Sequence, residues 1–528
     1  MNNPEFASRS NVLSAEGIAA TSQPLSSLEA ISVLKKGGNA IDAAIAASAV
    51  QSVVEPNSTG LGGDCFALIS INGEEPISVN GSGIAPKQLN FEYLKKNNLN
   101  KIDTTSPHSV TIPGAVHAWK TMHNKYGKLD FEELFINAEN YARFGYPVHE
   151  KVAKEWSKNL NKIKKNQNSA KVFLKNGEVY KFGEIHKNIQ LANTIKSVAK
   201  NGTNDFYHGF IAQDIVDSLN SIGGCHTMED FASQKTIVSK SINSKYKNII
   251  LHQCPPNGPG ISVLMMMAIL EKFNITEINP MSFERFHLQA EVTKVVYEER
   301  EKFVCDPKYF NIDTSALLET KYINSLYKKI SLNNCYKPTL PTFTSHPETI
   351  YITVVDKDLN CVSFINSICY AFGSGITTKN TGILLQNRGV NFRLEKNHPN
   401  CIEGHKRPLH TIIPGMVFNI KNQPILSYGV MGGQYQPVGH CHVLQNFFDF
   451  NMSIQESIDF PRAFCLNEKY QLENRIPNSI FEKLEKVGHN VNFDSNTHGG
   501  GQAIYIDREN GVLVGGSDYR KDGCAIGI

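Results

Sequence analysis

The sequence has no marked excess of charge and no long apolar run. Its 53 basic and 50 acidic residues leave a net charge of +3 over 528 residues, so no strongly basic surface for nucleic acid or an anionic membrane is expected. No apolar stretch approaches the roughly 20 residues that a membrane-spanning helix needs. We therefore expect neither a nucleic-acid nor a membrane partner.

The cysteines do not form a recognisable framework. There are eleven, an odd number, and none lies in a CxxC pair. We interpret most of them as small buried residues or free thiols in a reducing compartment. Residues 1–16 lack the cationic start and apolar core of a secretory signal, so a cytoplasmic location is expected.

Metal and phosphate motifs are also scarce. The run His440-Cys441-His442 is the one tight cluster of metal-ligand types, and no second ligand group stands at metal spacing. We interpret it as ordinary packing, and we expect no metal or cofactor. The glycines at 60, 62 and 63 precede no GK[ST] sequence, so they indicate a tight turn into a strand over 66–71.

What is present begins with helical patterns. Ser26 is a plausible cap for a helix over 28–36, which Gly37-Gly38 would end. A second helix opens at Asn39 or Asp42 and is so rich in alanine that it should be buried on most sides. The clearest helix is 283–303, capped by Ser282, in which we interpret His287 as a packing or surface residue.

Residues 349–367 predict a β-hairpin in mid-chain. Both arms are rich in β-formers, and the polar stretch 356–360 separates them. A three-residue loop would pair Asp356 with Asn360 and place Thr349 opposite Ser367. From spacing alone this is a Thr–Ser pair on an ordinary hairpin. The preceding residues 333–348 contain three prolines and indicate an exposed linker.

Six motifs change that interpretation. They are GGNAIDAAIAASAVQSVVEPNSTGLGGDCF at 37–66, TIPGAVHAW at 111–119, the hairpin followed by FGSGI and GILLQN, KRPLHTIIPGM at 406–416, GVMGGQYQP at 429–437 and SDYRKDGCAIG at 517–527. In this order they resemble the γ-glutamyltransferase family of N-terminal-nucleophile hydrolases. The resemblance runs from about residue 17 to residue 527.

The resemblance implies a fold and a processing event. The expected fold is α+β, a four-layer αββα sandwich with two stacked sheets. The precursor would cut itself between Glu348 and Thr349, giving a large subunit, 1–348, and a small subunit, 349–528. Both would contribute strands to one intertwined unit and remain associated as a heterodimer, since neither can bury its sheet face alone. Whether that heterodimer dimerises further is left open.

Cleavage would create the catalyst. A threonine hydroxyl needs a base beside it. The α-amino group freed by cleavage has a reference pKa of about 7.7–8.0 and can accept the hydroxyl proton. The predicted catalytic set is Thr349 and Ser367 with Gly432 and Gly433, the paired glycines whose N–H groups stabilise the oxyanion in the family. Without the resemblance, Gly432-Gly433 would be interpreted as a turn.

The predicted substrate pocket departs from the family pattern. The arginine that holds the glutamyl carboxylate in glutathione-hydrolysing members falls at or near Ser82. The family positions that hold the α-amino group look like Cys369, Arg388 and Asn391 in this chain. His410 and Thr411 stand where the family has two serines. Arginine offers only donors, so Arg388 with His410 would hold an anion near the scissile amide.

This pattern resembles the oxamate amidohydrolase-type branch. The leading hypothesis is therefore a self-processing amidohydrolase acting on a small carboxylate-bearing amide such as oxamate. The alternative is a γ-glutamyltransferase or glutathione hydrolase. A further alternative, from a different class, is an unprocessed homologue that binds without catalysis.

Overall fold

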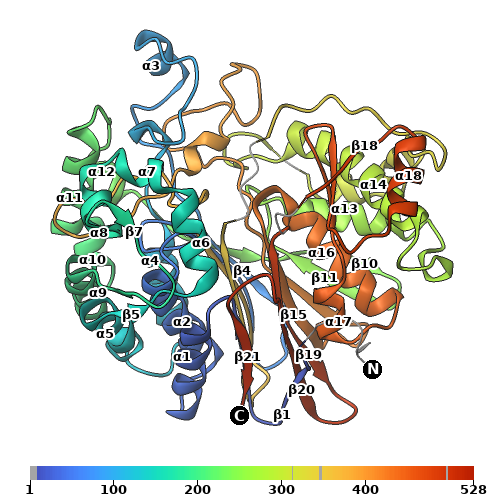
Figure 1. Cartoon of the computed structure of the whole chain (residues 1–528), viewed down its shortest axis with the longest axis horizontal. Helices are drawn as coiled ribbons and strands as arrows, with labels where there is room; N and C mark the ends of the chain where they lie inside the picture. Colours follow the sequence, from blue (N-terminus) through green and yellow to red (C-terminus); the bar gives the residue numbers. More distant parts are fainter. Residues whose placement is uncertain (1–8, 312, 344–347, 495–497) are drawn as a thin grey trace.

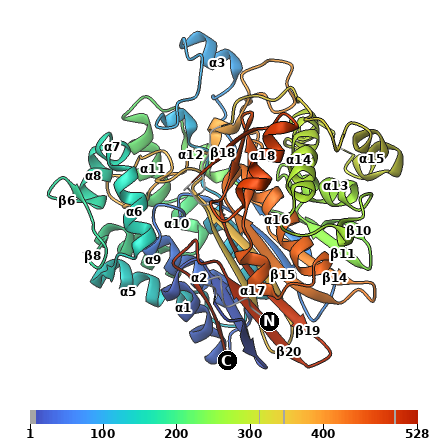
Figure 2. The same ribbon diagram turned by 45° about the vertical axis from the view of Figure 1, so that its right-hand side comes forward.

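The computed structural model describes residues 9–311, 313–343, 348–494 and 498–528. Two seven-stranded antiparallel sheets face each other at the centre, and helices cover the outer face of each, as Figures 1 and 2 show. This is the expected four-layer αββα arrangement. Apolar side chains fill the space between the two sheets, among them Phe66, Tyr351 and Met416.

The first sheet carries the hairpin near its centre. Its strands, in spatial order, are β21 (Cys524–Gly527), β2 (Ile18–Thr21), β12 (Ile350–Val355), β13 (Cys361–Ser367), β3 (Asp64–Ser70), β4 (Ile77–Gly81) and β9 (Ile237–Lys240). All seven residues of β3 and of β13 are buried, because a second sheet covers one face and helices cover the other.

The second sheet is built in the same way. Its strands, in order, are β1 (Val12–Ser14), β20 (Val512–Ser517), β19 (Gly500–Asp507), β15 (Pro424–Met431), β14 (Gly415–Asn419), β11 (Ile249–Gln253) and β10 (Ile242–Tyr246). Segments before and after residue 349 supply strands to both sheets. The two parts of the chain are therefore interleaved in both sheets.

Helices form the outer layers (Figure 1). Those beside the first sheet include α1 (Pro24–Lys35), α2 (Ala40–Val54), α4 (Ala115–Tyr126), α5 (Ile136–Phe144), α6 (Glu150–Lys158), α9 (Ile189–Asn201) and α11 (Phe210–Asn220). Those beside the second include α13 (Gly260–Leu270), α14 (Phe283–Phe303), α16 (Gln436–Leu444), α17 (Ile454–Asp459) and α18 (Asn478–Lys486). Within the described ranges, no helix combines the length and apolar character needed to cross a membrane.

Two helix predictions are confirmed and one needs correction. Helix α14 has the predicted bounds and its Ser282 cap, and α2 begins after Asn39 with every residue buried. Helix α1 starts four residues earlier than predicted. Pro24 occupies its first position, where a missing N–H costs nothing, and the Gln23 side chain accepts the Leu25 N–H in place of a Ser26 cap.

The hairpin register is confirmed. Ile350 pairs with Asn366 and Val355 with Cys361, and the Asp356 N–H donates to the Asn360 carbonyl across the loop. The linker prediction was wrong at its carboxyl end. Residues 333–343 have no regular structure, but Glu348 and Thr349 are buried, with exposed fractions of 2% and 0%. Predicted linker residues 344–347 lie outside the described residues.

Candidate active site

Thr349 and Ser367 meet at the open end of the hairpin. The Thr349 hydroxyl oxygen lies 3.1 Å from that of Ser367, and both residues are fully buried. The Thr349 hydroxyl also donates to the carbonyl oxygen of Glu348. The hydroxyl of the predicted nucleophile is thus in contact with the peptide that the family resemblance expects it to cleave.

The proton of the Ser367 hydroxyl can be assigned by elimination. Ser367 Oγ accepts the Cys369 N–H at 2.9 Å and an Arg388 Nη2–H at 3.2 Å, and both of those groups can only donate. Its own proton is therefore directed to Thr349 Oγ1. Cys369 has a φ of +80°, in the left-handed region that residues other than glycine rarely adopt. This backbone conformation directs its N–H toward Ser367.

Arg388 is a fully buried cation that pairs with none of the described carboxylates. Besides Ser367, its guanidinium donates to Thr411 Oγ1 at 2.8 Å, while its Nε–H has no hydrogen-bond partner among the described residues. The ion pairs formed by the described residues nearby, such as His410 with Asp64, do not include Arg388. A guanidinium in this state costs several kcal/mol of desolvation unless an anion joins it.

His410 is directed elsewhere. Its Nε2 lies 2.9 Å from Asp64 Oδ2, and its Nδ1 lies 3.5 Å from the Ile412 N–H. Burial, followed by the charge of Arg388, lowers the pKa of His410 to about 4. The ring is therefore neutral near pH 7, with its proton on Nε2 and donated to Asp64. Both nitrogens are engaged inside the protein, so the prediction that His410 grips a carboxylate beside Arg388 needs correction.

Asp64 and Gln386 are the site residues that sequence reasoning missed. Asp64 opposes Ser367 in the β3–β13 ladder. Its Oδ1 accepts the Gly83 N–H at 2.9 Å and Gln386 Nε2 at 3.0 Å. Gln386 Oε1 is buried and accepts no hydrogen bond among the described residues. A signal was available, because Asp64 is the acidic residue of GLGGDCF in the first family motif.

The paired glycines face the hairpin from the other sheet. Thr353 Oγ1 donates to Ser427 Oγ at 2.7 Å, and the Tyr351 ring packs on the backbone of Gly429. Side chains alternate along a strand, so Thr349 shares this face with Tyr351 and Thr353, and Met431 is the last residue of β15. Gly432 and Gly433 follow directly, with φ values of +128° and +56°.

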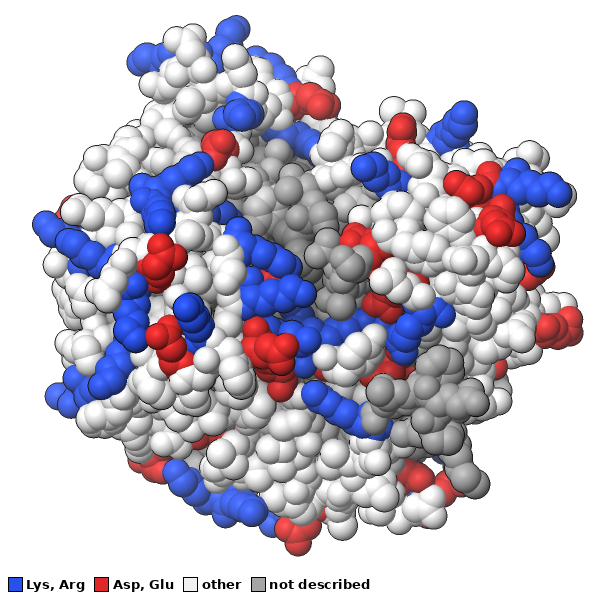
Figure 3. Space-filling view, in the orientation of Figure 1, with Lys and Arg blue, Asp and Glu red and all other residues white. Residues whose placement is uncertain are grey.

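A charged pocket lies behind the predicted cleavage point. The Glu348 carboxylate accepts the Ser58 hydroxyl at 3.0 Å and lies 3.6 Å from Lys521 Nζ. Burial raises the pKa of the neighbouring Glu55 to about 7, against the lowering effect of Lys521. Figure 3 shows a hollow on the face of the molecule seen in Figure 1, with charged side chains of both signs around it.

Two further predicted positions have no hydrogen bond to Thr349, Ser367 or Arg388 among the described residues. Asn391 donates to the carbonyl of Leu409 at 3.1 Å and accepts from Asn400, so it joins two loops. Ser82 is buried and donates to Asn80 Oδ1 at 2.7 Å. Of the predicted residues, Thr349, Ser367, Arg388 and Thr411 are therefore joined by hydrogen bonds. His410 bonds to Asp64, which lies opposite Ser367 in the sheet.

Comparison with known proteins gives a consistent result. The γ-glutamyltranspeptidase family model matches residues 26–528. The glutathione hydrolase-like YwrD proenzyme of Bacillus subtilis (strain 168) is 34% identical over 94% of this chain and 95% of its own. The oxamate amidohydrolase proenzyme of Klebsiella pneumoniae is 27% identical over 98% and 99%.

The fold comparison agrees. The crystal structure of cephalosporin acylase from Bacillus halodurans superposes with a TM-score of 0.93 and 34% identity, covering 100% of this chain and 98% of its own. These matches make the protein an enzyme of the amidohydrolase type and support the α+β fold. The chain belongs to the γ-glutamyltranspeptidase family.

Proposed function

We propose that the chain is a self-processing hydrolase in which Thr349 attacks amides whose acyl half carries a carboxylate. The observation that supports this best is Arg388, a buried guanidinium that has no carboxylate partner among the described residues and is bonded to the hydroxyl that contacts Thr349. An acyl group bound beside Thr349 could bring its carboxylate to the unpartnered Nε–H. The proenzyme names of the relatives support the self-processing part.

The proposed chemistry follows from the expected cleavage. The freed α-amino group of Thr349 takes the hydroxyl proton as Oγ1 attacks the amide carbonyl. Backbone N–H groups at Gly432 and Gly433 stabilise the oxyanion. The proton passes to the leaving amine as the C–N bond breaks, and water then hydrolyses the ester on Thr349.

We propose γ-glutamyl compounds, glutathione among them, as the leading substrate class. This reverses the order predicted from the sequence. The 34% identical relative is named glutathione hydrolase-like, whereas the oxamate amidohydrolase is 27% identical. A glutamyl group also carries an α-ammonium, which needs an acceptor, and the unpartnered Gln386 Oε1 stands two residues from Arg388.

Oxamate is the second candidate. It carries a carboxylate directly beside the amide and has no ammonium group. Arg388 offers donors only, which suits such a substrate. Gln386→Leu separates the two candidates, because it should weaken glutathione turnover and spare oxamate turnover.

Arg388→Gln tests the proposal. We expect kcat/KM for the best carboxylate-bearing substrate to fall by about 100-fold, the loss of one buried charge-assisted contact. Arg393→Gln is the matched control, since Arg393 pairs with Glu301. An amide of the same length without the carboxylate should lose much less in Arg388→Gln, because only the hydrogen bond from Arg388 to Ser367 is then affected. Unchanged affinity for the carboxylate-bearing substrate in Arg388→Gln would overturn the proposal.

A further inference from the structure

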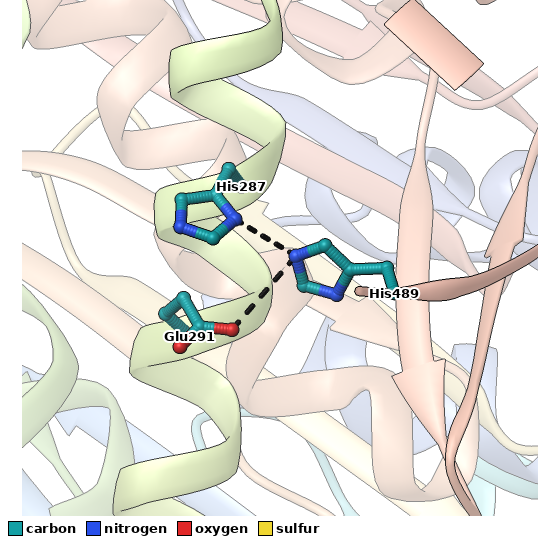
Figure 4. Close-up of side chains that lie close together, drawn as sticks. All are labelled: His287, Glu291 and His489. Carbon is teal, nitrogen blue, oxygen red and sulfur yellow. Dashed lines mark hydrogen bonds and ion pairs between the residues drawn. The ribbon is translucent and has the colours of Figure 1, made fainter. Parts of the chain in front are cut away.

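A second polar cluster is buried between α14 and the segment that leads into β18 (Asn490–Phe493). His287 and Glu291 lie one turn apart on α14, and His489 directly precedes β18. Figure 4 shows the three side chains converging, with His287 Nδ1 2.8 Å and Glu291 Oε1 3.8 Å from His489 Nε2. The three ligand atoms all lie within 4.8 Å of one another.

The two rings are oriented by their other nitrogens. His287 Nε2 lies 2.8 Å from the Ser331 carbonyl, so it carries the proton and leaves Nδ1 as the acceptor of the His489 Nε2–H. His489 Nδ1 faces Cys335 Sγ at 3.6 Å, which turns Nε2 toward the cluster. Metal-binding histidines are held in this way, by a hydrogen bond from the nitrogen that does not bind the ion.

We propose that His287, Glu291 and His489 bind a divalent transition-metal ion, with Zn²⁺ as the representative. Two imidazoles and a carboxylate are a donor set that suits this ion. Nitrogen ligands at 2.0–2.1 Å in a tetrahedral site lie about 3.3 Å apart, so the two rings must separate by about half an ångström. His489 stays neutral, because the proton leaves Nε2 and Nδ1 takes one up and donates it toward Cys335.

The neighbouring cavity gives the ion access to solvent. It has a volume of about 630 Å³ and is lined by His489, Lys294 and Cys335 among others. A water molecule from this cavity can fill the fourth position of the ion, as in zinc sites with three protein ligands.

Lys294 is the group that opposes binding. Its ammonium pairs with Glu291 and also donates to Cys335 Sγ and to the Tyr336 carbonyl, both at 2.8 Å. An incoming cation must share Glu291 with it. Removal of the Lys294 charge should therefore tighten metal binding, a direction that damage to the fold would not produce.

The position of the site gives it a consequence. His287 and Glu291 precede residue 349, and His489 follows it. A bound ion would join the two segments that the proposed cleavage separates. The binding itself does not depend on cleavage, so it can be measured in uncut protein.

Zinc titration of the full chain against a chromogenic chelator tests the proposal, with Thr349→Ala protein measured in parallel as the uncut form. We expect one Zn²⁺ per chain in both. His287→Gln, which keeps an N–H for the Ser331 carbonyl, and Glu291→Gln should each lose at least about 100-fold in affinity. Lys294→Met should gain about 10-fold, and bound Co²⁺ should show the ligand-field bands of a four-coordinate site.

His226→Gln is the matched control. His226 is also buried and bonds the Val110 carbonyl through Nε2, and it has no part in the cluster. It should bind Zn²⁺ as wild type does. The proposal is overturned if wild type binds no stoichiometric Zn²⁺, or if His287→Gln binds it as tightly as His226→Gln. Loss of cleavage with retained Zn²⁺ binding would count against the proposed function alone.

Discussion

Ser367 Oγ lies 3.1 Å from Thr349 Oγ1 and accepts hydrogen bonds from Cys369 and Arg388. Ser367 is therefore a donor to the predicted nucleophile and not a base for it. In this arrangement Ser367 fixes the position of Thr349 Oγ1, and the proton must be removed by another group. The α-amino group that cleavage would free is the base the family resemblance supplies.

Ser367→Ala should slow both self-cleavage and amide hydrolysis by about 100-fold, the effect of removing one well-placed donor at a reacting oxygen. Thr353→Val is the control, because Thr353, on the neighbouring strand β12, makes a similar buried hydroxyl contact with Ser427. Cleavage can be followed by denaturing gel and turnover by amine release. Wild-type rates in Ser367→Ala would contradict the assignment.

Gly432→Ala should impair turnover more than stability. A Cβ at Gly432 would lie 2.8 Å from Gly499 Cα, at a φ of +128°, so the turn must shift. We expect a loss of about 1–3 kcal/mol in unfolding free energy, with turnover falling at least 10-fold. Gly511→Ala also forces a positive φ, +67°, but in open space, and it should lose stability only. Equal turnover in the two variants would argue against an oxyanion role.

Lys521→Met should destabilise the folded protein. The largely buried Lys521 ammonium lies near Glu348, Glu55 and Glu155, whose charges raise its pKa against the lowering effect of burial. Removing one partner of a buried charge cluster costs about 3–5 kcal/mol. Adding Glu55→Gln should restore part of the loss, since one carboxylate fewer is then left unpaired. Denaturant unfolding measures both, and Lys175→Met, which breaks an exposed pair, should change little.

Stability should fall on acidification from about pH 6.5 to pH 4. Burial lowers the pKa of seven histidines to about 3 or 4, namely His186, His226, His252, His410, His440, His489 and His498. The unfolded chain binds more protons in this window, so unfolding free energy drops as pH falls, by at most about 3 kcal/mol for each histidine.

Glu55 acts in the opposite direction. Its pKa is raised to about 7 in the folded state, so its contribution is lost as pH rises from about 4.5 to 7. Burial also raises the pKa of Glu29, Glu155 and Asp522, which act in the same direction as Glu55. We expect the seven imidazoles to outweigh these four carboxyls. Denaturant midpoints between pH 7 and pH 4 check the balance, and a midpoint that stays constant or rises toward pH 4 would contradict it.

Local patterns predicted local structure well. The alternating arms and the polar loop predicted the hairpin register, and Ser282 predicted the start of α14. Both features are set by residues that are close together in the sequence. The start of α1 was missed because Gln23 is an unusual cap. The buried state of Glu348 depends on Ser58 and Lys521, which are remote in the sequence.

Contacts between distant residues were predicted only where the family resemblance supplied them. Asp64 and His410 are 346 positions apart, and nothing in their local sequence indicates that they meet. The proposed metal site likewise joins His287 and His489, which are 202 positions apart, so spacing within short segments could not indicate it. The four layers were likewise expected from the resemblance and not from composition.

The most direct test is intact mass with amino-terminal sequencing of freshly purified wild type and Thr349→Ala. We predict that wild type separates into fragments of 348 and 180 residues, the second beginning at Thr349, and that Thr349→Ala remains one chain of 58.7 kDa. A single 58.7 kDa chain in both proteins would mean that Thr349 never gains a free amino group, which would contradict the account.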